Sequence, residues 1–205
     1  MPVDAQPLVA ALWLGASLAA VLWVPGLLAL CASGHGARGF DRLAIATGVS
    51  VTLWPLALLW SGVVGLTWTP SGVRIAAAIA VICLIVVAWL DVRRSRGNGE
   101  SGRASAGEMV TASAAVLAVV LAIGVALRWS HARGLAVTPW VDGLHHTLIV
   151  RMILEAGSVP DGFRPFLPVD GFYYHFGFHT LAAAVAALSG ASPAKATLWT
   201  GQALS

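Results

Sequence analysis

The sequence is poor in charged side chains, which make up only 10% of it, whereas 58% of the residues are hydrophobic. Soluble domains usually contain about 25% charged residues. The charges are also unevenly placed, because three long stretches lack them altogether: 5–37, 43–73 and 75–90. So few charges could not cover the surface of a water-soluble globule of this size. The composition excludes a soluble enzyme, a disordered tail and a nucleic-acid-binding domain, and it predicts a polytopic membrane protein.

Cysteine is scarce as well, and familiar catalytic motifs are absent from the sequence. Cys31 and Cys83 both lie in apolar runs, so they indicate neither a disulfide framework nor a metal motif. The sequence contains no phosphate-binding glycine motif, no nucleophile elbow and no HExxH. The net charge of +3 comes from arginines beside apolar runs, where positive charge orients membrane helices. Nucleic acid is therefore not an expected partner.

The apolar runs predict an all-α fold, a polytopic transmembrane helix bundle. A bilayer core about 30 Å thick needs roughly 20 helical residues to cross it. The predicted spans are Leu8–Ala32, Leu43–Trp68, Val73–Leu90, Met109–Leu127 and a weaker one over Phe172–Leu188, and Lys195–Ser205 begins a sixth. A cleaved signal peptide is the competing interpretation of the first run. That run follows no Lys or Arg and is longer than a signal-peptide core, which favours a span.

The arginines predict the orientation and the organisation of the chain. They gather in the first and third loops: Arg38, Arg42, Arg93, Arg94, Arg96 and Arg103. The N-terminal tail has no Lys or Arg, and the second loop has only Arg74. The positive-inside rule then places the N-terminus outside and the loop 128–171 on the extracytoplasmic side. We expect a multi-pass protein of the cytoplasmic membrane, with a three-span region 1–90, a cytoplasmic linker 91–108 and a second module 109–205.

The external loop is predicted to contain a short surface helix. Asp142 suits its N-cap, and Gly157 followed by Pro160 supplies a stop signal. The helix has two lines of side chains at a spacing of four, one polar (Thr147, Arg151, Glu155) and one apolar (Leu144, Leu148, Met152). We expect it to lie along the membrane or to pack on the bundle rather than to cross.

Polar residues with a possible chemical role gather in this loop and at the mouth of the fifth span. Asp142 and His146 are four residues apart, as are His175 and His179. If the surface helix folds back over that mouth, these groups surround one crevice together with His145, Tyr173 and Tyr174. The alternatives are that Asp142 only caps the helix and that His145, His146 and the tyrosines are interfacial residues. His179 lies inside an apolar helix, where an ionisable group is a functional candidate.

The order of these parts resembles the GT-C superfamily of membrane glycosyltransferases. Three pieces carry the resemblance: Trp140-Val-Asp-Gly-Leu-His-His146, Gly157-Ser-Val-Pro160 and Tyr173-Tyr-His-Phe-Gly-Phe-His-Thr-Leu-Ala182. The superfamily includes oligosaccharyltransferase catalytic subunits and protein mannosyltransferases, and the chain looks most like the large bacterial members with extra N-terminal spans. The resemblance covers roughly residues 109–190. The first three predicted spans match only in general character.

The resemblance implies transfer of a sugar from a polyprenyl-phosphate donor to a lipid, glycan or protein acceptor at the outer face of the membrane. Asp142 would then be the general base, or it would help to hold a divalent metal such as Mg or Mn, with His146 and His179 as further candidate ligands. The substrate and phosphate site would include His145, His146, Arg151, Tyr173, Tyr174, His175 and His179, and Arg164 is an alternative phosphate partner.

The chain departs from this family in extent, because it supplies only the first spans of the shared module. Ser205 falls inside a predicted helix, so we expect further spans or a partner subunit to be needed, and we expect no activity from this stretch alone. Three other interpretations stay open: a transporter or flippase fragment, a membrane metalloprotein using the histidines, and a non-catalytic membrane protein. The residues do not identify the donor sugar or the acceptor.

The orientation can be tested by cysteine labelling in intact cells. In a variant lacking Cys31 and Cys83, a cysteine at Asp161 should react with a membrane-impermeant maleimide from outside, because arginine asymmetry places this loop there. A cysteine at Ser101, in the predicted cytoplasmic linker, is the matched control and should react only after permeabilisation. The reverse pattern would contradict the orientation and remove the basis for an outer-face site.

Overall fold

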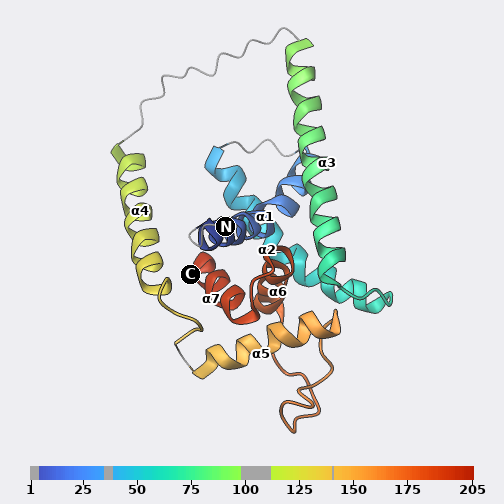
Figure 1. Ribbon diagram of the computed structural model, residues 1–205. Coiled ribbons are helices and arrows are strands. Elements are labelled where there is room, and N and C mark those ends of the chain that lie inside the picture. Colours follow the sequence, from blue (N-terminus) through green and yellow to red (C-terminus); the bar gives the residue numbers. More distant parts are fainter. Residues whose placement is uncertain (1–4, 35–38, 98–111, 140) are drawn as a thin grey trace.

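The computed structural model describes residues 5–34, 39–97, 112–139 and 141–205. Within them the chain forms helices and no strands (Figure 1), which confirms the all-α prediction. The helices are α1 (Ala5–Ala32), α2 (Gly39–Val63), α3 (Pro70–Gly97), α4 (Ala112–Ala132), α5 (Val141–Ala156), α6 (Gly177–Ser189) and α7 (Pro193–Leu204).

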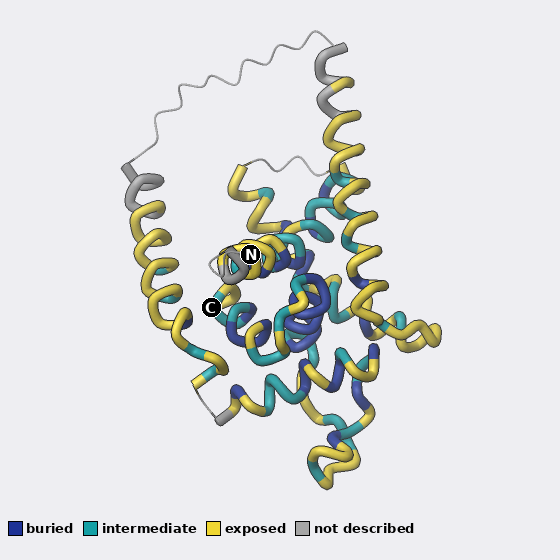
Figure 2. Tube along the Cα trace, viewed as in Figure 1, coloured by how far each residue is buried: buried dark blue, intermediate teal, exposed yellow. Residues whose placement is uncertain are grey.

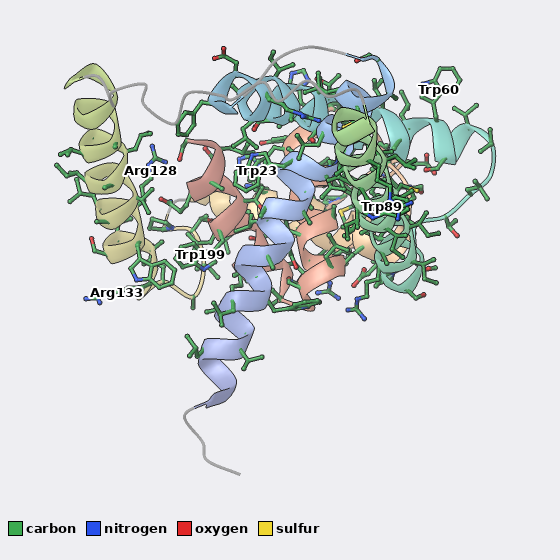
Figure 3. The ribbon with its side chains drawn as sticks, turned by 90° about the horizontal axis from the view of Figure 1, so that it is seen from above. Trp23, Trp60, Trp89, Arg128, Arg133 and Trp199 are labelled. Atoms are coloured by element: carbon green, nitrogen blue, oxygen red, sulfur yellow. The ribbon has the colours of Figure 1, made fainter. Side chains whose placement is uncertain are left out.

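The first three helices are those of a membrane protein. Each has a segment long and apolar enough to cross a bilayer: Leu8–Ala32, Gly39–Val63 and Pro70–Leu90. Figure 2 shows that α3 is exposed along most of its length, and its exposed side chains are largely apolar. In Figure 1 the view is nearly along the axis of α1, whereas α3 stands upright. In Figure 3, which is turned by 90°, α1 stands upright and α3 is seen nearly end-on. These two candidate spans therefore cross instead of running side by side.

The fourth predicted span corresponds to α4, a helix of 21 residues that ends at Ala132, five residues beyond the predicted Leu127, whereas the fifth is shorter than the sequence indicated. The apolar segment of α4 among the described residues is Ala118–Ala132, and the start of the predicted span, 109–111, lies outside those residues. α6 begins five residues after Phe172 and has only 13 residues. It is bent by 119° from α7, so the pair forms either one broken span or a re-entrant loop. By length and composition the described residues contain three candidate spans, or four if this pair is one span.

α6 lies at the centre of the packed helices. Its residues His179–Leu188 are all buried, and α1, α2, α3 and α5 pack around them. Half of the segment is alanine, which allows neighbouring helices to approach closely. The chain turns away at Gly190, whose φ of 72° lies in the left-handed region and whose N–H donates to the carbonyl oxygen of Ala186. This glycine is the physical reason why the predicted span stops.

α1 and α2 form the closest helix pair at Gly26. A Cβ at this position would overlap the backbone carbonyl of Ala46. The N–H of Gly26 donates to the hydroxyl of Ser50 across the interface, with an N–O distance of 2.8 Å. The indole of Trp54 adds a second link by donating to the carbonyl oxygen of Val21. Pro25 precedes this glycine inside α1, so the interface also supplies a partner to backbone near the proline.

Substituting the two glycines of α1 should have opposite effects. Gly26→Ala should destabilise the protein by about 1–3 kcal/mol, because α1 and α2 would have to separate to admit the methyl group. Gly15→Ala places its Cβ in open space and should stabilise the helix by about 0.5–1 kcal/mol. Thermal unfolding of the two variants in detergent, followed by circular dichroism, measures both effects. Equal melting temperatures would show that the close approach at Gly26 does not exist.

Candidate functional site

The predicted surface helix is present as α5, Val141–Ala156, and it ends at Gly157 as expected. Asp142 lies in its first turn rather than at its N-cap, and its side chain is exposed. The buried face of α5 consists of Ile149, Val150, Met152 and Ile153, which pack with Leu58 of α2 and with alanines of α6. Within the predicted apolar line Met152 is buried, whereas Leu144 is 62% exposed, because only the later turns of α5 pack on this cluster.

The end of α5 is fixed by a backbone contact with the loop between α2 and α3. The N–H of Trp68 donates to the carbonyl oxygen of Gly157, with an N–O distance of 2.6 Å. Gly157 has a φ of +67°, and a Cβ on it would lie 2.7 Å from the backbone oxygen of Trp68. Glycine is therefore required both for the turn and for the close approach. This contact sets how α5 lies across the bundle.

A hydrogen-bonded pair of histidines joins α5 to the first turn of α6. Nδ1 of His146 lies 2.8 Å from Nε2 of His179, and Nδ1 of His179 lies 2.9 Å from the carbonyl oxygen of His175. Because a carbonyl only accepts, Nδ1 of His179 carries a proton. In the neutral ring Nε2 then accepts from the Nδ1–H of His146. Nδ1 of His146 is engaged in this hydrogen bond, so Nε2 is the ring nitrogen with which His146 can contact a ligand.

Aromatic side chains surround the histidine pair. Tyr174 and Phe178 meet the ring of His146 edge-on, with centroids 6.2 Å and 5.8 Å away. Phe163, from the loop between α5 and α6, meets Tyr174 in the same way and stacks on Phe172 at 5.4 Å. His179 is only 2% exposed, whereas Tyr174 is 44% exposed. The pair is thus buried on the α6 side and reachable beside Tyr174.

The structure brings together some of the predicted site residues and leaves others apart. His146, His179 and Tyr174 form one cluster, which confirms that α5 folds back over the start of α6. His175 contributes its backbone carbonyl to the cluster while its side chain is exposed, and Tyr173 is 85% exposed. His145 is half-buried, and its Nδ1 has no hydrogen-bond partner among the described residues. Sequence reasoning missed Phe163 and Phe178, although Phe178 stands directly before His179.

The two arginines that were candidate phosphate partners are both paired with carboxylates. Arg151 donates to Glu155 one turn later, at 2.7 Å, which agrees with the predicted polar line of α5. Arg164 pairs with Asp170 across the loop between α5 and α6. Both pairs are largely exposed, and such pairs hold their side chains only weakly. A phosphate would therefore have to compete with a carboxylate for either guanidinium group.

The described side chains do not form a metal site around Asp142, His146 and His179. No group of three or more His, Cys, Asp or Glu side chains suited to a metal ion occurs in the described part of the chain. The two histidines also direct Nδ1 and Nε2 at each other, so neither nitrogen faces a common metal position.

Comparison with known proteins places the chain in one family. The family described as "Family of unknown function (DUF6541)" matches residues 19–201, from within α1 into α7, so the chain belongs to it. No curated protein and no solved structure matches the chain.

The proton positions in the histidine pair can be tested by NMR. In ¹⁵N-histidine-labelled protein, His179 should carry its proton on Nδ1, because that atom donates to the carbonyl oxygen of His175. His146→Phe should alter the Nε2 resonance of His179, because its hydrogen-bond partner is lost, and His131→Phe in α4 is the matched control. A His179 signal that is unchanged in the His146 variant would contradict the contact between the two rings.

Proposed function

We propose that this member of the DUF6541 family is part of a membrane glycosyltransferase similar to the GT-C enzymes. It would transfer a sugar from a polyprenyl-phosphate donor to a lipid, glycan or protein acceptor at the outer face of the membrane. The observation that carries the proposal is the contact between His146 and His179, which joins the helix bearing Asp142 to a buried apolar helix. A polar cluster on one side and an apolar bundle on the other suit a substrate with a lipid tail and a charged head.

Asp142 is the proposed general base. When an acceptor hydroxyl attacks the anomeric carbon, the bond between that carbon and the phosphate oxygen breaks, and its electron pair leaves with the phosphate. The hydroxyl proton must go to a base within hydrogen-bond reach. Asp142 is exposed at the start of α5 and is therefore accessible to an acceptor arriving from water.

His146 is the proposed phosphate-binding group, and His179 is the residue that positions it. With Nδ1 of His146 donating to His179, a protonated His146 would offer Nε2–H to the departing phosphate oxygen. His179 cannot turn freely, because its other nitrogen is bonded to the carbonyl oxygen of His175. A fixed donor is worth more in a partly buried site than a mobile one, because little reorganisation is needed.

The orientation and the full set of spans also belong to the proposal. We place the N-terminus and the loop 128–171 outside, α4 as the fourth span, and the bent pair α6–α7 as one further membrane element, because neither of its helices alone is long enough to cross. Further spans or a partner subunit would complete the acceptor side, and Tyr173, His145 and His175 would line it. The exposure of Tyr173 and of the His175 side chain supports this, because both are available to additional protein or to substrate.

A transporter or flippase is the second candidate, and one observation favours it. α6 and α7 form a sharply bent pair, and broken helices are typical of transporter binding sites. In such sites the polar groups lie at the break itself. Here the histidine pair lies at the opposite end of α6 from the bend at Gly190. The position of the histidine pair therefore differs from that of a transporter site, although Ser192 and Lys195 do lie just after the break.

Substitution of Asp142 tests the proposed reaction in membrane vesicles from cells that produce the protein from its native gene, together with any further spans or partner subunit. With a polyprenyl-phosphate donor carrying a radiolabelled sugar, Asp142→Asn should lower transfer about 10²–10⁴-fold, because the base is lost. Asp170→Asn, which removes a carboxylate from the exposed pair with Arg164, should leave transfer unchanged. Undiminished transfer by the Asp142 variant would overturn the base assignment.

The same vesicles separate the two candidate functions. A transferase converts the labelled donor into a new product, whereas a carrier moves the donor across the membrane without changing it. His179→Leu should reduce the transfer rate as well, and membrane insertion measured alongside shows whether that loss is only structural.

A further inference from the structure

A second polar site lies away from the histidine pair, between α1, the end of α4 and the start of α7. It is a cavity of about 420 Å³. Its lining comes from three parts of the chain. These are the α1 side, with Leu14 and Leu18, the end of α4 and the residues after it, with Trp129 and Arg133, and the start of α7, with Lys195 and Trp199. None of these residues belongs to the site described above.

Among the described residues the lining of the cavity carries positive charge without a balancing carboxylate. Arg133 and Lys195 both line it, although they lie far apart in the sequence, and none of its lining residues is Asp or Glu. The start of α7 adds the positive end of a helix dipole, since Ser192 is its N-cap and accepts a hydrogen bond from the backbone N–H of Lys195. The cavity therefore favours an anion.

The remaining walls of the cavity are apolar. The rings of Trp129 and Trp199 lie 5.0 Å apart, and Leu14 and Leu18 line the α1 side. Figure 3 shows Trp199 and Arg133 on the side of the molecule where α4 stands. Tryptophans beside basic residues are typical of the boundary between lipid and water. A ligand of this cavity needs both an anionic group and an apolar part.

The neighbouring surfaces distinguish a lipid from a water-soluble anion. On α1, Leu8 and Leu12 are largely exposed, and so is Val125 on α4. The cavity is too small to enclose a whole phospholipid, but chains leaving it would meet these apolar surfaces. An acidic peptide or free phosphate would gain nothing from them.

We propose that this cavity binds an anionic phospholipid. The phosphate lies between the side chains of Arg133 and Lys195, and an acyl chain runs past Trp129 and Trp199 along α1. Such a lipid would also tie α4 to the other helices, which it otherwise meets through the contact between Trp129 and Trp199 and through Arg128, a hydrogen-bond donor to the backbone of Gln202 and to the hydroxyl of Ser205. The site does not depend on the glycosyltransferase proposal, because binding needs no catalysis.

Tryptophan quenching by brominated lipids tests the site on the purified protein in detergent. Phosphatidylglycerol with brominated chains should quench a component of the fluorescence at about tenfold lower concentration than brominated phosphatidylcholine, because two cations face its charge. The preference should vanish in R133Q/K195Q, which removes the charges. It should also vanish in W129F/W199F, which removes the reporters. R151Q/R164Q, with the same loss of charge elsewhere, is the matched control and should keep the preference.

Several outcomes would overturn the proposal. Equal quenching by the two lipids would do so, as would a preference that survives in R133Q/K195Q. Relief of the quenching by millimolar inorganic phosphate would show that the ligand is a free anion and not a lipid. If the double variant does not fold, as judged by its helix content, R133Q and K195Q carry the test singly, and each should lose part of the preference.

Discussion

Ten consecutive residues of α6, His179–Leu188, are buried, and the surrounding helices supply the contacts that this burial requires. A helix enclosed on every side has no water for its last carbonyl groups, so other elements must supply donors. Arg74 donates to the carbonyl oxygen of Ala187, and the indole of Trp13 donates to that of Leu188. The starts of α3 and α1 are thereby tied to the end of α6. The small side chains of α6 then allow α2 and α5 to pack on its remaining faces.

The same burial explains why the histidine pair is ordered. An ionisable ring inside an apolar helix is costly unless its polar atoms are satisfied. His179 meets that requirement through His175 behind it and His146 in front. Since the second partner comes from α5, satisfying His179 also holds the surface helix in place. The backbone contact between Gly157 and Trp68 fixes the other end of that helix. A structural need and a candidate chemical site therefore coincide, and Nε2 of His146 is the one nitrogen of the two rings that these hydrogen bonds do not use.

Much of this arrangement could be predicted from the sequence, and the exceptions have physical reasons. Charge-free runs located the first three long helices, and the pattern from Asp142 to Gly157 gave the bounds of α5 to within a residue. The contact between His146 and His179 was expected only if α5 folded back, and the structure confirms that fold. The predicted length of α6 was wrong, because the hydropathy of the sequence does not show that the helix begins only at Gly177, after a turn that follows Phe172. The sequence could not predict that Arg133 and Lys195 line one cavity, because sequence spacing relates only side chains on the same helix.

The bend between α6 and α7 connects the two sites. Gly190 permits the left-handed turn that ends α6, and Ser192 then starts α7 in a new direction. A straight continuation would carry Lys195 farther along the axis of α6, away from α4. The bend instead sets the start of α7 against α1 and the end of α4, where the positively charged cavity forms. The start of α6 thus carries His179, whereas Lys195 lies just after the bend. A change in the bend would therefore alter the cavity while leaving the first turn of α6 in place.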